Sequence, residues 1–103
     1  MNDFQKSKLT EDEYKFCAES NDRLLTADIV TVAQRAVIIE DIRSRCRDKF
    51  DVVITQEYNL ALETTEIYRF DLNGKANYIF FDTMSRQAGI IPAANSRRIS
   101  NDD

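Results

Sequence analysis

The chain has 103 residues, of which 43% are hydrophobic and 31% are charged, with a formal net charge of −4 and no histidine. This length fits one globular domain spanning residues 1–103. The acidic balance argues against a general nucleic-acid binder, whose surface is normally basic. Without histidine the chain lacks the base of a protease-type triad and the imidazole of a zinc cluster. We therefore expect a non-enzymatic protein that uses no cofactor and no metal.

Both ends of the chain are polar, and we expect flexible tails over residues 1–8 and 92–103. The first residues lack the apolar core of a signal peptide, and no run approaches the roughly 20 apolar residues of a membrane span. These patterns favour a cytoplasmic protein without a membrane partner. The tail segment Arg97-Arg98-Ile99-Ser100 resembles a kinase site, a short match that is common by chance.

A first helix is predicted from Glu11 to about Leu24. Thr10 can cap this helix, and Glu13 can bond back to the Thr10 amide, which makes a capping box. Leu9 before the cap can pack on Tyr14 as a hydrophobic staple. The side chains expected to face the core are Tyr14, Cys17, Ala18 and Leu25.

A second helix is predicted from a cap at Thr26 to Phe50, a segment without Gly or Pro. One apolar stripe runs along its whole length and consists of Val32, Ala36, Ile39, Ile42, Cys46 and Phe50. A second apolar face covers the first half only and consists of Ile29, Val30, Ala33 and Val37. That half must be covered on two sides: the first helix can cover one, and a sheet or a second subunit must cover the other. We expect self-association, as a dimer, through this helix or through a sheet edge.

The pattern changes to β structure after Asp51. β-Branched residues predict a strand over 52–55. Residues 57–63 (EYNLALE) fit both a strand and a helix, and we favour a strand because the segment that follows is clearly β.

Alternating apolar residues on both sides of Asn73-Gly74 predict a β-hairpin over residues 65–83. We expect a bulged three-residue loop, Leu72-Asn73-Gly74, rather than a two-residue Asn-Gly turn. The longer loop places Phe70 opposite Ala76 and Tyr68 opposite Tyr78, so that the aromatic side chains share one face.

Together the elements predict an α+β fold, in which two N-terminal helices pack on a small antiparallel sheet that contains the Asn-Gly hairpin. A mainly α domain with one β-hairpin is the alternative.

Arg35 lies on the helical wheel between Ile39 and Ile42, within the apolar stripe of the second helix. A charge in such a place is costly unless it is paired. Asp28 or a carboxylate on a strand could provide that partner. Alternatively, this face meets another protein, where arginine is an enriched anchor.

One basic cluster is visible, Arg43 to Lys49, with two basic side chains on each flank of the stripe. Arg43 and Arg47 share one flank, and Arg45 shares the other with Lys49. Basic side chains beside an apolar stripe often cover it with their stems, and we expect Arg45→Ala to change stability little. Together with Arg35, we predict Arg43 and Arg47 as partner-binding residues.

Other chemistry is weakly signalled. Cys17 and Cys46 are expected to be buried and unpaired, although the arginines that flank Cys46 could activate its thiol. The carboxylates that could meet across strands to hold a hard cation are Glu57, Glu63, Glu66, Asp71 and Asp82, but we expect them to be solvated. The aromatic hairpin could stack RNA bases, but it lacks interleaved basic residues and is expected to be core.

The sequence favours a small acidic interaction protein, such as a regulator, inhibitor or adaptor, that binds another macromolecule, most simply a protein. The alternative is a winged-helix-type DNA-binding protein. In that arrangement the second helix breaks near Ala33 and Gln34, residues 43–49 lie on the recognition helix, and the 65–83 hairpin is the wing. The acidic net charge makes a nucleic-acid partner the weaker expectation.

Overall fold

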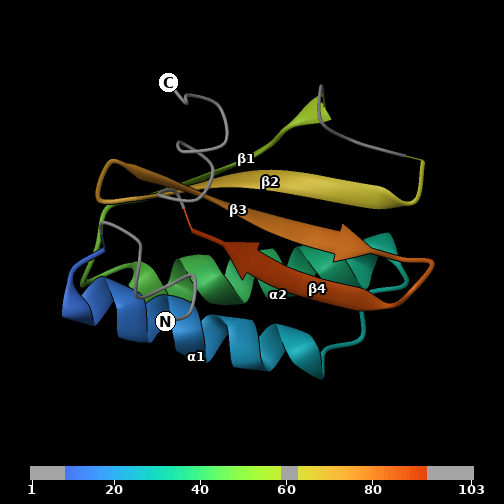
Figure 1. The fold of residues 1–103 in the computed structure, drawn as a ribbon, viewed down its shortest axis with the longest axis horizontal. Helices are drawn as coiled ribbons and strands as arrows, with labels where there is room; N and C mark the ends of the chain where they lie inside the picture. The colour runs from blue at the N-terminus through green and yellow to red at the C-terminus, as the bar shows by residue number, and fades with distance from the viewer. Residues whose placement is uncertain (1–8, 59–62, 93–103) are drawn as a thin grey trace.

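The computed structural model describes residues 9–58 and 63–92. Two helices, α1 (Glu11–Leu25) and α2 (Val32–Cys46), are followed by four strands, β1 (Val52–Gln56), β2 (Thr65–Leu72), β3 (Lys75–Asp82) and β4 (Gln87–Ile91). The strands form one antiparallel sheet in the order β1-β2-β3-β4, and both helices lie on the same face of it (Figure 1). The predicted α+β fold is confirmed.

The helices divide the sheet between them: α1 packs beside β4, and α2 packs beside β1. The core lies between the helix layer and the sheet, and its largest fully buried side chains include Phe70, Phe81, Ile42, Leu72 and Ile79. The tails predicted over 1–8 and 92–103 lie outside the described residues, except for Pro92. Pro92 is fully buried, so the predicted tail boundary is wrong at that residue.

Helix α1 begins at its predicted capping box. The Thr10 amide donates to Glu13 Oε1 at 2.9 Å, and the Glu13 amide donates to Thr10 Oγ1 at 3.3 Å. The predicted inward face is partly wrong, because Leu25 is 67% exposed. Leu24 is buried instead, since it continues the helical spacing from Cys17 and from the other buried positions, which are Glu13, Phe16 and Ser20.

Helix α2 begins five residues later than the predicted cap at Thr26, at an N-cap formed by Thr31. Thr26 instead terminates α1, where its amide donates to Arg23 O at 3.4 Å. Thr31 is the better cap because Gln34 reciprocates. The Gln34 amide donates to Thr31 Oγ1 at 3.1 Å, and the Thr31 amide donates to Gln34 Oε1 at 3.0 Å. The helix ends at Cys46, before the predicted limit at Phe50.

Strand β1 confirms the strand predicted over 52–55 and extends it to Gln56. The strand favoured over 57–63 is wrong where it can be checked, because Glu57, Tyr58 and Glu63 lie outside the strands. Residues 59–62 lie outside the described part of the chain. The Glu57 amide still donates to Ile67 O at 2.8 Å, so the β1–β2 ladder closes one residue beyond β1.

The β2–β3 hairpin has a two-residue Asn73-Gly74 turn, and the predicted bulged loop is wrong. Both turn residues have positive φ, 52° and 80°, as a tight hairpin turn requires. Phe70 therefore lies opposite Asn77, whose Nδ2 donates to the carbonyl oxygens of Phe70 at 3.3 Å and Lys75 at 3.2 Å. These hydrogen bonds let an amide side chain be fully buried opposite an aromatic ring.

The two-residue turn also divides the aromatic side chains between the two faces of the sheet. Phe70, Tyr68 and Phe81 face the helices, and Tyr68 packs edge-on against Phe81 with ring centroids 5.7 Å apart. Tyr78 and Phe80 alternate with buried residues of β3 and face the other side. The single aromatic face expected from the sequence does not form.

Glu13 joins the start of α1 to this hairpin. Its carboxylate accepts hydrogen bonds from Asn73 Nδ2 and Lys75 Nζ, each at 2.7 Å, and the residue is 3% exposed. Burial by itself raises the pKa of Glu13, but hydrogen bonds from Lys75, Asn73 and the Thr10 amide outweigh burial and lower this pKa.

Because the folded state holds the lower pKa, Glu13 stabilises the fold above its ordinary pKa, and this contribution is lost as pH falls through the folded value. We expect Glu13→Gln to lower the free energy of unfolding at pH 7 by about 2 kcal/mol. The difference between wild type and variant should shrink as pH falls below 4.5, the ordinary value. Urea melts of both proteins across an acidic pH series test this, and a difference that stays constant with pH would contradict it.

Candidate partner-binding surface

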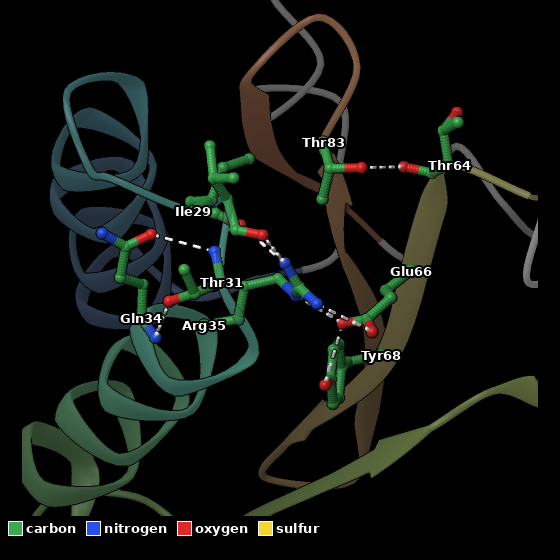
Figure 2. Close-up of polar contacts among 9 residues, drawn as sticks. Ile29, Thr31, Gln34, Arg35, Thr64, Glu66, Tyr68 and Thr83 are labelled. Atoms are coloured by element: carbon green, nitrogen blue, oxygen red, sulfur yellow. Dashed lines mark hydrogen bonds and ion pairs between the residues drawn. The ribbon is translucent and has the colours of Figure 1, made fainter.

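Arg35 lies inside the fold, between α2 and the sheet. Figure 2 shows its guanidinium directed at Glu66 of β2, with which it forms a two-point ion pair, Nε to Oε1 at 2.8 Å and Nη2 to Oε2 at 3.3 Å. Nη1 donates to the carbonyl oxygens of Ile29 at 2.7 Å and Val30 at 2.9 Å. The Arg35 side chain is 8% exposed.

This pairing assigns Arg35 a structural task. The guanidinium ties α2 to the α1–α2 connection and to β2, which explains how a charge is accommodated within an apolar stripe. The partner is a strand carboxylate, one of the two alternatives considered, and not Asp28. Because Arg35 is buried and paired, it does not lie on the exposed surface where the sequence had placed it as a partner-binding residue.

Tyr68 completes this cluster from β2. Its hydroxyl donates to Glu66 Oε1 at 3.3 Å (Figure 2). Burial raises the pKa of Tyr68, and the negative charge of Glu66 raises it further. The phenol therefore stays protonated and remains a donor at neutral pH.

Arg43 and Arg47, the other two predicted site residues, lie on the outer side of α2 and share one carboxylate. Arg43 Nη1 lies 3.6 Å from Glu40 Oε1, and Arg47 Nη2 lies 3.7 Å from Glu40 Oε2. Their side chains are 45% and 67% exposed. Arg43 also donates from Nη2 to the carbonyl oxygen of Ile54 on β1 at 3.2 Å. The sequence did not indicate this last contact, because it joins a side chain to a backbone atom.

Arg45 is more deeply placed than predicted. It donates to Asp41 Oδ2 at 3.1 Å and to Ser20 Oγ of α1 at 2.9 Å, and its guanidinium carbon lies 4.8 Å from the ring centroid of Phe16. Its side chain is 20% exposed. The expectation that Arg45→Ala changes stability little therefore loses its premise, because Arg45 connects the two helices.

The outer face of α2 is apolar over its first two turns. Val32 is 72% exposed and Val37 is 68% exposed, and between them lie Ala33 and Ala36, which are also exposed. Val30, just before the helix, is 49% exposed. We call these residues the valine face: Val30, Val32, Ala33, Ala36 and Val37.

The valine face corrects part of the predicted stripe, because the positions expected to be buried at Val32 and Ala36 are exposed. Ile39, Ile42 and Cys46 are buried as predicted. The first half of α2 is turned toward the sheet through Arg35, so its buried side is narrow and its valines point away. The sequence predicted more apolar surface on this half than the first helix alone covers. In the structure Val30, Ala33 and Val37 of the predicted second face are exposed, so the sheet does not cover them.

A groove of about 350 Å³ between the helices adjoins this face. Its apolar walls include Leu24, Ala27, Val37 and Ile38, and Arg23 and Asp41 lie at its rim. Val37 therefore belongs to both the valine face and the groove.

The two cysteines are buried and free, as predicted. Burial raises the pKa of Cys17 to about 12 and that of Cys46 to about 11, although the charge of Arg45 lowers the latter. At neutral pH both thiols remain protonated, so the flanking arginines do not activate Cys46.

The carboxylates considered for a cation do not gather in the part of the chain that the structure describes, where no group of three or more acidic or thiol side chains is placed to hold a metal ion. Glu66 pairs with Arg35, and Asp71 pairs with Arg69 at 3.0 Å. The helix break required by the winged-helix alternative is also not found, because α2 is continuous across Ala33 and Gln34.

Within residues 9–58 and 63–92, no helix is long and apolar enough to cross a membrane. No family model, curated protein or solved structure matches this chain.

Proposed function

We propose that this protein is a small acidic regulator, inhibitor or adaptor that acts by binding another protein through the valine face. The observation that carries the proposal is the exposure of Val32 and Val37, at 72% and 68%, on one side of a single helix. Apolar side chains gathered on a rigid element and rimmed by charge are typical of the centre of a protein interface. Glu40 and Arg47 provide charges on the same side of α2.

The polar chemistry of the described residues supports binding over catalysis. The thiols are protonated at neutral pH, since burial raises their pKa. The buried arginine and the buried glutamate at the hairpin are both engaged in structural contacts. The buried arginine and glutamate stabilise the fold that presents α2.

A capture experiment from the native host tests the proposal. We expect tagged wild-type protein to retain a specific partner, and a Val32→Asp/Val37→Asp variant to lose it, because buried carboxylates oppose desolvation at the centre of an interface. Met84→Asp is the matched control, since Met84 is also an exposed apolar side chain, at 78%, but lies in the β3–β4 turn. If the double variant and the control captured the partner equally well, the valine face would be excluded as the binding surface.

Self-association is a second candidate that the same valines favour. If a second copy covers the face, light scattering at micromolar concentration should give a dimeric mass, and the Val32→Asp/Val37→Asp variant should give a monomeric one. A strictly monomeric mass for the wild type would exclude self-association, and the proposed partner of the valine face would then be a different protein.

A further inference from the structure

The register of the sheet determines which backbone groups of its two edge strands point outward. Asp51 O accepts from Asn73 N at 2.7 Å, and Glu57 N donates to Ile67 O at 2.8 Å, so odd-numbered residues of this segment face β2. Antiparallel pairing alternates these directions along a strand. The amide and carbonyl groups of Val52, Ile54 and Gln56 therefore face away from the sheet.

The opposite edge, β4, lies beside α1 and is partly occupied by it. The Ile90 amide points outward and donates to Asn21 Oδ1 of α1 at 2.9 Å. A Cβ on Gly89 would come within 3.1 Å of the same oxygen. Ala88 and Ile90 are only 4% and 7% exposed. A strand from another molecule would have to displace Asn21 from the Ile90 amide to pair with β4.

On the β1 edge Ile54 is also buried, at 8% exposed, whereas Val52 and Gln56 are partly exposed. Among the outward-facing groups of Val52, Ile54 and Gln56, a side chain of the described residues contacts one, the Ile54 carbonyl, which accepts from Arg43 Nη2 at 3.2 Å. An arginine donor thus occupies the place where the amide of an added strand would lie. Arg43 is 45% exposed, so its guanidinium can turn toward solvent without unpacking the core.

The flank of α2 beside this edge is positive on an otherwise acidic chain. Arg43 and Arg47 share the single carboxylate of Glu40, which leaves one positive charge in excess. The chain as a whole carries −4. A second copy at the same edge would bring an identical positive flank against the first, which disfavours that occupant.

The opposite face of β1 has a different character. Val53 is 59% exposed there, and Thr55 is also exposed. By the same alternation Asp51 and Glu57 lie on this face at the two ends of the strand. Carboxylates on an added strand are therefore attracted to the helix side and repelled from the outer side.

We propose that the β1 edge binds an extended acidic segment of a partner protein as a fifth strand. Its backbone pairs with Val52, Ile54 and Gln56, its carboxylates alternate toward Arg43 and Arg47, and its β-branched side chains lie beside Val53. Arg43 exchanges its bond to Ile54 O for a carboxylate of the partner. The proposal rests on the proposed protein-binding function, to which it adds the partner's chemistry and a second contact region.

The test uses full-length protein and short capped peptides of alternating Glu and Val, a matched peptide of Lys and Val, and a Glu–Val peptide methylated at alternate backbone nitrogens. We expect the Glu–Val peptide to shift the amide NMR signals of Val52, Ile54 and Gln56 and to slow exchange of the Ile54 amide. Affinity should fall as salt increases, since the arginines are exposed. The Lys–Val peptide should not bind, and methylation of the pairing nitrogens should abolish binding.

Arg43→Gln should weaken binding of the Glu–Val peptide about tenfold, the loss of one charge-assisted hydrogen bond. Arg69→Gln is the matched control, because Arg69 is 46% exposed but lies on the outer face of β2. Equal affinity for Glu–Val and Lys–Val peptides, or full binding of the methylated peptide, would overturn the proposal. So would an absence of binding, or β1 amides already protected in a dimer of the free protein.

These outcomes separate the two proposals. The peptide test can fail while the Val32→Asp/Val37→Asp variant still loses its partner. That result would exclude the added strand and support the valine face. If the peptide binds but partner capture does not depend on Val32 and Val37, the valine face is excluded and the added strand is retained.

Discussion

Ile39→Asp is expected to unfold the domain, whereas Val37→Asp is expected to leave it folded. The two positions lie on the same helix and start from similar apolar side chains, but Ile39 is 5% exposed and Val37 is 68% exposed. An unpaired carboxylate at Ile39 would be buried beneath α2, at a cost of several kcal/mol. That cost is a large share of a total stability of about 5–15 kcal/mol.

Urea melts followed by circular dichroism measure this difference directly. We expect Ile39→Asp to lack a folded baseline and Val37→Asp to melt close to the wild type. Similar midpoints for the two variants would show that α2 presents a different face to the sheet, and would also remove the basis of the valine face.

Arg35→Met should destabilise the protein by about 3–5 kcal/mol, the cost of breaking a buried ion pair from one side. The substitution leaves Glu66 without its cation in a site where its side chain is 29% exposed. It also removes the donor shared by the carbonyl oxygens of Ile29 and Val30. Methionine keeps an unbranched apolar stem and a similar helix propensity, so the change mainly removes the guanidinium and its polar contacts.

Arg47→Met is the control for this measurement, because Arg47 is 67% exposed and its loss should change the urea midpoint little. The double variant Arg35→Met/Glu66→Leu should recover part of the loss, since it removes the orphaned carboxylate. The two carbonyl oxygens remain without their donor, so recovery should be incomplete. If Arg35→Met and Arg47→Met had the same urea midpoint, the ion pair would contribute nothing to stability.

Features encoded within a few residues could be read from the sequence alone. The Thr10–Glu13 capping box sets the start of α1, because both partners lie in one turn. The Asn73-Gly74 pair places the hairpin, because both residues tolerate positive φ. The burial of Ile39, Ile42 and Cys46 follows from their helical spacing. These elements were sufficient for the α+β class.

The choice among near-equal local alternatives depended on contacts between distant segments. Leu24 rather than Leu25 is buried because the packing of α1 sets which side of its last turn meets the core. The cap of α2 is a different case, because the Thr31–Gln34 capping box is a local pattern that the prediction of a cap at Thr26 overlooked. The two-residue turn prevails over the bulged loop because Asn77 finds hydrogen-bond partners inside the core. A local sequence pattern does not show whether a buried amide side chain will find hydrogen-bond partners.

The candidate surfaces divide in the same way. An excess of apolar residues in the first half of α2 was visible in the sequence, since helical spacing alone reveals it. Which of them remain exposed was decided by Arg35, whose partner Glu66 lies 31 residues away. The contact between Arg43 and Ile54 O depends on α2 lying beside an edge strand. Only the tertiary structure brings these groups together, because sequence spacing specifies the faces of an element but not the neighbour that each face meets.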